Sequence, residues 1–79
     1  MHTQIESQVL GLLKKTLNYE VTPKDYDTPR ADFQSWDSLV HMEIIFSCED
    51  LFGIEFSPED LETLNSTGAL IKCILGKLN

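Results

Sequence analysis

The central half of this sequence lacks Lys and Arg altogether. The whole chain has six Lys and Arg residues against 13 Asp and Glu residues, which gives a formal net charge of -7 at pH 7. No Lys or Arg lies between Ala31 and Ile71, whereas nine acidic residues do. Nucleic acids and anionic membranes attract proteins of the opposite charge, so we expect neither as a partner. A strongly acidic surface instead favours partner proteins with basic patches.

Cysteines, long apolar runs and a signal peptide are also scarce or absent. Cys48 and Cys73 are the only cysteines. Two distant cysteines on apolar stretches favour buried free thiols over a disulfide framework or a zinc site. No apolar run is long enough to span a membrane, and the polar first residues are not those of a signal peptide. We therefore expect a cytoplasmic location.

The length of the chain limits its organisation. With 79 residues only one hydrophobic core can form, which predicts a single domain over residues 1–79. So short a chain leaves little room for an enclosed active site, which favours a binding or carrier module over an enzyme. We expect this domain to be a monomer.

The first helix is predicted from Thr3 to Leu17. Thr3 and Glu6 form a capping box, and apolar residues then recur at helical spacing as far as Asn18, which is a suitable stop. Residues 19–36 show no such periodicity and contain two prolines, so they predict a long loop.

A second helix is predicted from Ser38 to Phe52. Asp37 is a favourable N-cap, and Gly53 is a favourable residue after the last turn. Apolar residues form one wide side of this helix, which we expect to face the core: Val40, Ile44, Ile45, Cys48, Leu51 and Phe52.

Two further helix starts follow. Ser57 and Pro58 predict a short helix, and residues 65–67 cap a last helix. No strand pattern is convincing, so the predicted fold class is all-α. The expected architecture is a four-helix bundle of three main helices and one short helix, with a long loop between the first two helices.

The start of the second predicted helix resembles the attachment site of acyl and peptidyl carrier proteins. The Asp-Ser-Leu motif of that family stands at Asp37–Leu39, within the stretch Trp-Asp-Ser-Leu-Val-His-Met-Glu-Ile-Ile of residues 36–45. The resemblance includes the long loop before the motif and the helix starts after it, and so covers essentially the whole chain. It implies a four-helix bundle of the acyl carrier type.

The same resemblance implies that the Ser38 hydroxyl receives 4'-phosphopantetheine from coenzyme A. A phosphopantetheinyl transferase and its magnesium ion would activate that hydroxyl. The attached phosphate would be anionic, and the N-terminus of a helix stabilises anions through its dipole and free N–H groups. The further implied partners are an acyl- or aminoacyl-loading enzyme and downstream synthase or transferase enzymes. Catalysis then belongs to the partners.

The resemblance also implies a docking face for these partners along the second helix. Leu39, Met42 and Phe46 lie on one side of that helix, away from the core side. Acidic residues border this stripe and would meet basic patches of the partners: Asp37, Glu43, Glu49 and Asp50. Such a charged rim steers and orients brief encounters.

Two other classes of protein compete with a carrier. His41 follows Ser38 by one turn, which could indicate a nucleophile pair of a small hydrolase, but no Gly-x-Ser-x-Gly motif surrounds this serine. We therefore interpret His41 as a surface residue beside the arm. An unmodified helical adaptor, in which Asp37 and Ser38 only cap a helix, remains the alternative of another class.

Trp36 departs from the pattern of fatty-acid synthesis carriers, which usually have a small residue before Asp-Ser-Leu. With Trp at this position, the sequence is more similar to stand-alone carriers of polyketide, peptide, glyceryl or aminoacyl pathways. This departure favours a specialised biosynthetic pathway, with a fatty-acid synthesis carrier as the alternative.

Overall fold

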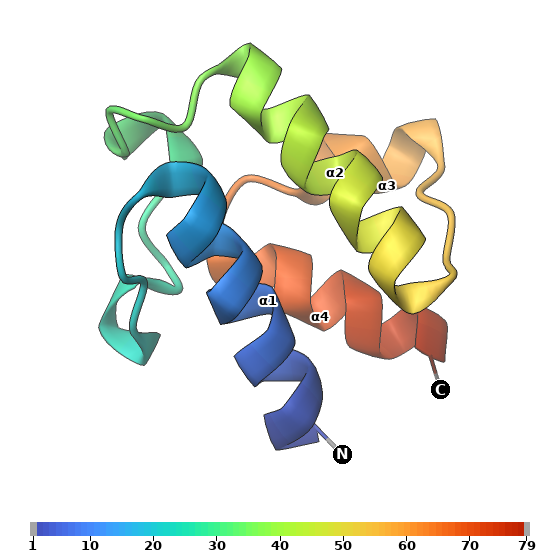
Figure 1. The fold of residues 1–79 in the computed structure, drawn as a ribbon. Helices are drawn as coiled ribbons and strands as arrows, with labels where there is room; N and C mark the ends of the chain where they lie inside the picture. Colours follow the sequence, from blue (N-terminus) through green and yellow to red (C-terminus); the bar gives the residue numbers. More distant parts are fainter. Residues whose placement is uncertain (1, 79) are drawn as a thin grey trace.

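The computed structural model describes residues 2–78 and the side chains of residues 4–78. Within this range the chain forms four α-helices and no β-strand, which confirms the predicted all-α class (Figure 1). The helices are α1 (His2–Leu17), α2 (Ser38–Phe52), α3 (Pro58–Thr63) and α4 (Thr67–Leu78). Helix α1 packs against α2 and α4, and the short α3 packs against α4. No helix in the described part of the chain is both long enough and apolar enough to cross a bilayer.

Helix α1 ends where the sequence predicts and begins one residue earlier. Asn18, directly after the last turn, has the left-handed φ of 56° that suits an asparagine at this position. Because α1 already includes His2, Thr3 is not its N-cap. The side chain of Thr3 lies outside the described residues. The Glu6 carboxylate accepts a hydrogen bond from Tyr26 Oη of the long loop at 2.8 Å.

The bounds of α2 agree with the prediction because both ends carry strong local signals. The Asp37 carboxylate accepts a hydrogen bond from the Val40 N–H at 2.9 Å, as an N-cap does. Gly53 ends the helix with a left-handed φ of 64°, a conformation that costs glycine little. Helix α3 begins with a capping box in which Ser57 and Asp60 each accept the other's backbone N–H.

The core lies between α1, α2 and α4. Among the described side chains it contains thirteen buried apolar ones, three of which come from α2: Ile44, Ile45 and Cys48. The expectation that Leu51 also faces the core is wrong, since half of this residue is exposed. Leu51 sits in the last turn of α2, at the margin of the apolar side. The two thiols are free; Cys48 is buried and Cys73 is half-buried.

The long loop between α1 and α2 is tied to the rest of the bundle along its length. The Arg30 N–H donates to the Asn65 carbonyl at 2.6 Å, and the Gly68 N–H donates to the Tyr26 carbonyl at 3.0 Å. A Cβ atom at position 68 would lie 3.0 Å from that carbonyl oxygen, so glycine permits this close approach. The loop is therefore fixed against the start of α4.

The start of α2 lies at one end of the molecule. In Figure 1, α2 begins at the top of the view, whereas α1 begins and α4 ends near the bottom. The molecule measures 31 × 26 × 20 Å along its principal axes. Residues at the start of α2 are thus presented away from the first turn of α1 and the last turn of α4.

Candidate functional site

Ser38 is the first residue of α2 and is exposed. The Asp37 carboxylate bonds the Val40 N–H, and the His41 N–H bonds the Asp37 carbonyl at 2.8 Å. The first four N–H groups of an α-helix have no partner within the helix. Asp37 satisfies that of Val40, whereas those of Ser38 and Leu39 stay free. An accessible hydroxyl beside free N–H groups and the positive end of a helix dipole suits an anionic substituent such as a phosphodiester.

His41 does not lie on the surface beside Ser38, and our interpretation of it as a surface residue is wrong. Only 8% of His41 is exposed, and its Nδ1 accepts a hydrogen bond from Trp36 Nε1 at 3.1 Å. Trp36 is itself 4% exposed. Burial lowers the pKa of His41, and the positive charge of Arg30 lowers it further. Because Nδ1 accepts from the indole, the neutral imidazole carries its proton on Nε2, the nitrogen that would act as the base in a Ser–His pair. The imidazole therefore serves packing at the start of α2.

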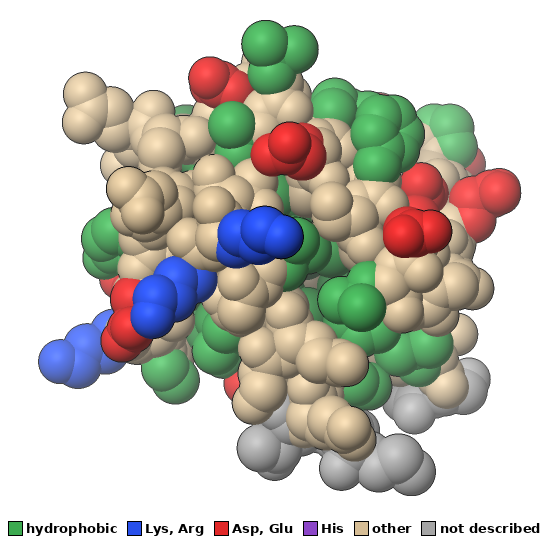
Figure 2. Space-filling model, in the orientation of Figure 1, with side chains coloured by type: hydrophobic (Ala, Val, Ile, Leu, Met, Phe, Trp, Pro, Cys, Tyr) green, Lys and Arg blue, Asp and Glu red, His purple; other side chains and the backbone are tan. Residues whose placement is uncertain are grey.

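The predicted docking stripe is exposed along α2. Leu39 is 83%, Met42 39% and Phe46 60% exposed, which is unusual for large apolar side chains. Asp37, Glu43 and Asp50 are exposed as well. In Figure 2, apolar and acidic side chains alternate over the upper part of the molecule where α2 runs, while the visible Lys and Arg side chains run from near the centre of the view to its lower left.

Glu49 differs from the other acidic residues of the predicted docking face. Its carboxylate accepts a hydrogen bond from the Phe56 N–H at 2.9 Å, and the residue is half-buried. The Glu49 carbonyl also accepts from the Ile54 N–H at 3.2 Å. This residue holds the segment between α2 and α3 in place, so less of its carboxylate is available to a partner than in Glu43 or Asp50.

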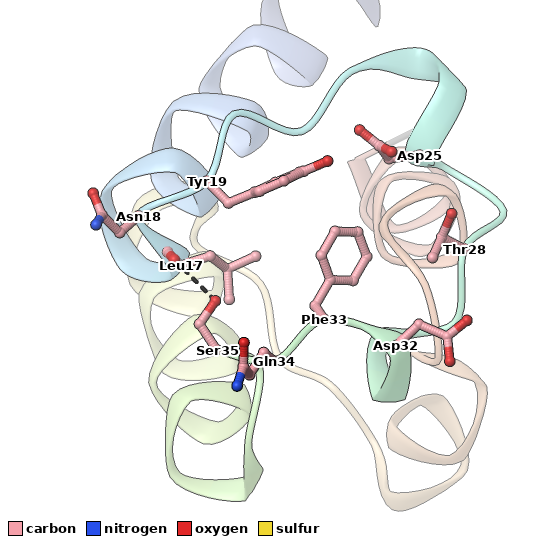
Figure 3. Close-up of a pocket in the computed structure, with 9 residues that line it drawn as sticks. All are labelled: Leu17, Asn18, Tyr19, Asp25, Thr28, Asp32, Phe33, Gln34 and Ser35. Atoms are coloured by element: carbon pink, nitrogen blue, oxygen red, sulfur yellow. Dashed lines mark hydrogen bonds between the residues drawn. The ribbon is translucent and has the colours of Figure 1, made fainter.

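An open hollow of about 660 Å³ lies beside the long loop, apart from the docking stripe (Figure 3). The rings of Tyr19 and Phe33 meet edge to face in it, with centroids 5.4 Å apart. Ser35 Oγ closes one side by donating to the Leu17 carbonyl at 2.9 Å. Ser38 does not line this hollow, and the lack of periodicity in residues 19–36 gave no sequence signal for it.

Comparison with known proteins identifies the class to which this fold and this helix start belong. A family model described as "Phosphopantetheine attachment site" matches residues 7–74. The acyl carrier protein of Buchnera aphidicola subsp. Schizaphis graminum (strain Sg) is 34% identical over 73 residues, which cover 92% of this chain and 92% of that protein. No solved structure matches the chain.

The chain is therefore a phosphopantetheine-carrying domain. More particularly, it belongs to the acyl carrier protein family, and the group it carries covalently is 4'-phosphopantetheine. The geometry at the start of α2 fits this group, because the exposed Ser38 hydroxyl and the free helical N–H groups lie together there.

Proposed function

We propose that Ser38 carries the phosphopantetheine arm and that residues 1–79 form one carrier domain. The observation that carries this proposal is the exposed serine in the first turn of α2, held by the Asp37 N-cap. In the loading reaction Ser38 Oγ attacks the pantetheine-bearing phosphate of coenzyme A. The new O–P bond replaces the bond to adenosine 3',5'-diphosphate, and the hydroxyl proton passes to a base of the transferase. The thiol of the loaded arm holds an acyl group as a thioester.

The docking stripe of Leu39, Met42 and Phe46, with its acidic border, supports binding to enzymes with basic patches. Such enzymes are the phosphopantetheinyl transferase, an acyl- or aminoacyl-loading enzyme and the downstream synthase or transferase enzymes. Exposed acids steer a basic partner toward the face, and the apolar centre supplies the contact area. Asp37, Glu43 and Asp50 are the exposed acids of this border, and Glu49 contributes at its edge.

The cargo pathway that we favour is a specialised one, of the polyketide, peptide, glyceryl or aminoacyl kind. Trp36 supports this proposal, because fatty-acid synthesis carriers usually have a small residue before Asp-Ser-Leu. We also favour a monomer in the cytoplasm. Mass spectrometry of the protein purified from its native host identifies the group on the arm; a long saturated acyl chain there would instead indicate fatty-acid synthesis.

The arm site is tested by incubating the pure protein with a broad-specificity transferase and coenzyme A. Intact mass should rise by one phosphopantetheine group, and Ser38→Ala should abolish the gain. Ser7→Ala is the matched control, because Ser7 is an exposed serine of α1, and this variant should load normally. Failure to gain mass with several transferases would indicate the unmodified helical adaptor instead. A gain that persists in Ser38→Ala would place the arm on another residue.

A further inference from the structure

A buried hydrogen bond brackets the proposed arm site. Trp36 Nε1 donates to His41 Nδ1 at 3.1 Å, joining the residue before the N-cap to the fourth residue of α2. The four residues between them include Asp37, which caps the helix, and Ser38. The ring of Phe33 lies beside the indole in a tilted arrangement, with ring centroids 5.8 Å apart. The indole is thus held between the long loop and α2.

We propose that the Trp36–His41 hydrogen bond is a clamp that orients Ser38 for transfer of phosphopantetheine, so that Trp36 and His41 are positioning residues for that reaction. This inference rests on the proposed arm at Ser38. It also assigns a role to Trp36, whose large side chain is the departure from fatty-acid carriers noted above.

The two hydrogen bonds at this helix start differ in exposure to water, and this difference gives the clamp its role. The Asp37 cap bonds the Val40 N–H at an exposed position, where water competes for both groups. The Trp36–His41 bond is buried, so water cannot replace it without opening the packing. The buried bond therefore fixes the path by which the chain enters α2, and the cap and Ser38 follow from that path.

The protonation state of His41 decides whether the clamp can form. An indole N–H only donates, so Nδ1 must be the acceptor and the imidazole proton must lie on Nε2. Protonation of Nδ1 places two donors against each other and opens the bond. Arg30, from the 3₁₀ turn Arg30–Asp32, is the charged group whose field reaches the ring, while on α2 itself the Asp37 carboxylate is engaged by the Val40 N–H.

Both burial and Arg30 favour the neutral imidazole and lower the pKa of His41 from its usual 6.5. Because the pKa of His41 is lower in the folded chain than in the unfolded one, the contribution of the clamp to the free energy of unfolding is complete above pH 6.5. This contribution is lost as the pH falls through the lower pKa of the folded chain. The clamp is closed at neutral pH and opens in acid.

Two neutral amides at position 41 separate the clamp from simple packing. The Asn oxygen can occupy the position of Nδ1, whereas the Gln oxygen lies one carbon further out. We therefore compare His41→Asn, His41→Gln and Trp36→Phe. The rate of loading by a transferase is measured for each variant, and circular dichroism establishes that each is folded. The Trp36 indole N–H resonance is measured for the parent chain and for the two His41 variants.

Trp36→Phe and His41→Gln should load about fivefold more slowly than the parent sequence, the factor expected for one net hydrogen bond. The loss should fall on kcat rather than KM, because the docking stripe is unchanged. His41→Asn should recover most of the rate. Its rate relative to the parent sequence should rise as the pH falls through the lowered pKa of His41 in the folded chain. This ratio cancels the pH dependence of the transferase itself.

The outcomes distinguish the clamp from the arm site. At about pH 7.5 an ordinary imidazole is neutral. Failure of the parent chain, without substitutions, to load at this pH overturns the arm at Ser38. Normal loading of that chain together with equal rates for all three variants overturns the clamp. So does an indole N–H resonance that is the same in His41→Asn and His41→Gln and does not change with pH.

Discussion

Phe46 and Ile45 are adjacent in α2, but only Phe46 faces away from the core. Phe46 is 60% exposed and Ile45 only 2% exposed. A Phe side chain offers roughly 200 Å², so about 120 Å² is available to a partner, worth up to about 3 kcal/mol at ~25 cal/mol per Å². Phe46→Ala should therefore reduce kcat/KM for loading about tenfold to a hundredfold. Its free energy of unfolding should fall by less than about 1.5 kcal/mol, since alanine favours the helix.

Ile45→Ala is the matched variant in which folding, not docking, is perturbed. Removing a buried Ile side chain costs about 2–5 kcal/mol, which for a chain of this size lowers Tm by about 10 °C or more. Thermal unfolding followed at the helical circular dichroism band, together with loading kinetics below Tm, separates the two effects. Loading of Phe46→Ala at the unmodified rate, or equal losses of Tm in both variants, would refute the division of α2 into a docking side and a core side.

Three further measurements test other features of the structure. Glu43→Lys reverses an exposed charge beside the docking stripe; it should slow loading at low ionic strength and lose most of that effect in high salt, and a salt-independent defect would contradict steering. Gly53→Ala should lower the free energy of unfolding by about 1 kcal/mol, because φ is 64° there. In contrast, Gly11→Ala has open space and should stabilise α1 by up to about 1 kcal/mol, so equal effects at the two glycines would count against this account. Hydrogen bonds from Lys77 and from the Ser57 N–H lower the pKa of Asp60 from 3.8 to about 2. This contribution to stability is complete above pH 3.8 and is lost as the pH falls through about 2, so Asp60→Asn should flatten the acid end of the unfolding profile.

Local signals explain how much of the fold could be predicted. Asp37, Gly53 and the pair Ser57 and Pro58 act within three or four residues of their own position. The sequence alone therefore shows these helix ends correctly. The exposed stripe of α2 is likewise a matter of helical spacing. The choice of Ser38 as the arm site follows from its place after the cap and from the family motif. Its modification remains a prediction.

The errors concern contacts made across the ends of α2 and the incomplete cover of its last turn. Helical spacing places His41 near Ser38, but an indole five residues earlier in the chain covers the imidazole and takes its Nδ1. Helical spacing predicts Glu49 as a surface acid, but its carboxylate accepts a hydrogen bond from the Phe56 N–H. Leu51 belongs to the apolar side by spacing, yet no neighbouring helix covers it fully. Such pairings depend on tertiary packing, which no local pattern encodes.

The placement of the helix ends has a consequence for how this domain can be joined to others. The first turn of α1 and the last turn of α4 lie away from the start of α2 (Figure 1). A linker, an affinity tag or a neighbouring catalytic domain attached beyond either of these turns would leave the molecule on the side remote from Ser38. The region swept by a flexible arm and the region occupied by a tether then do not compete. One architecture can therefore serve equally well as a freely diffusing shuttle and as a module within a larger assembly line.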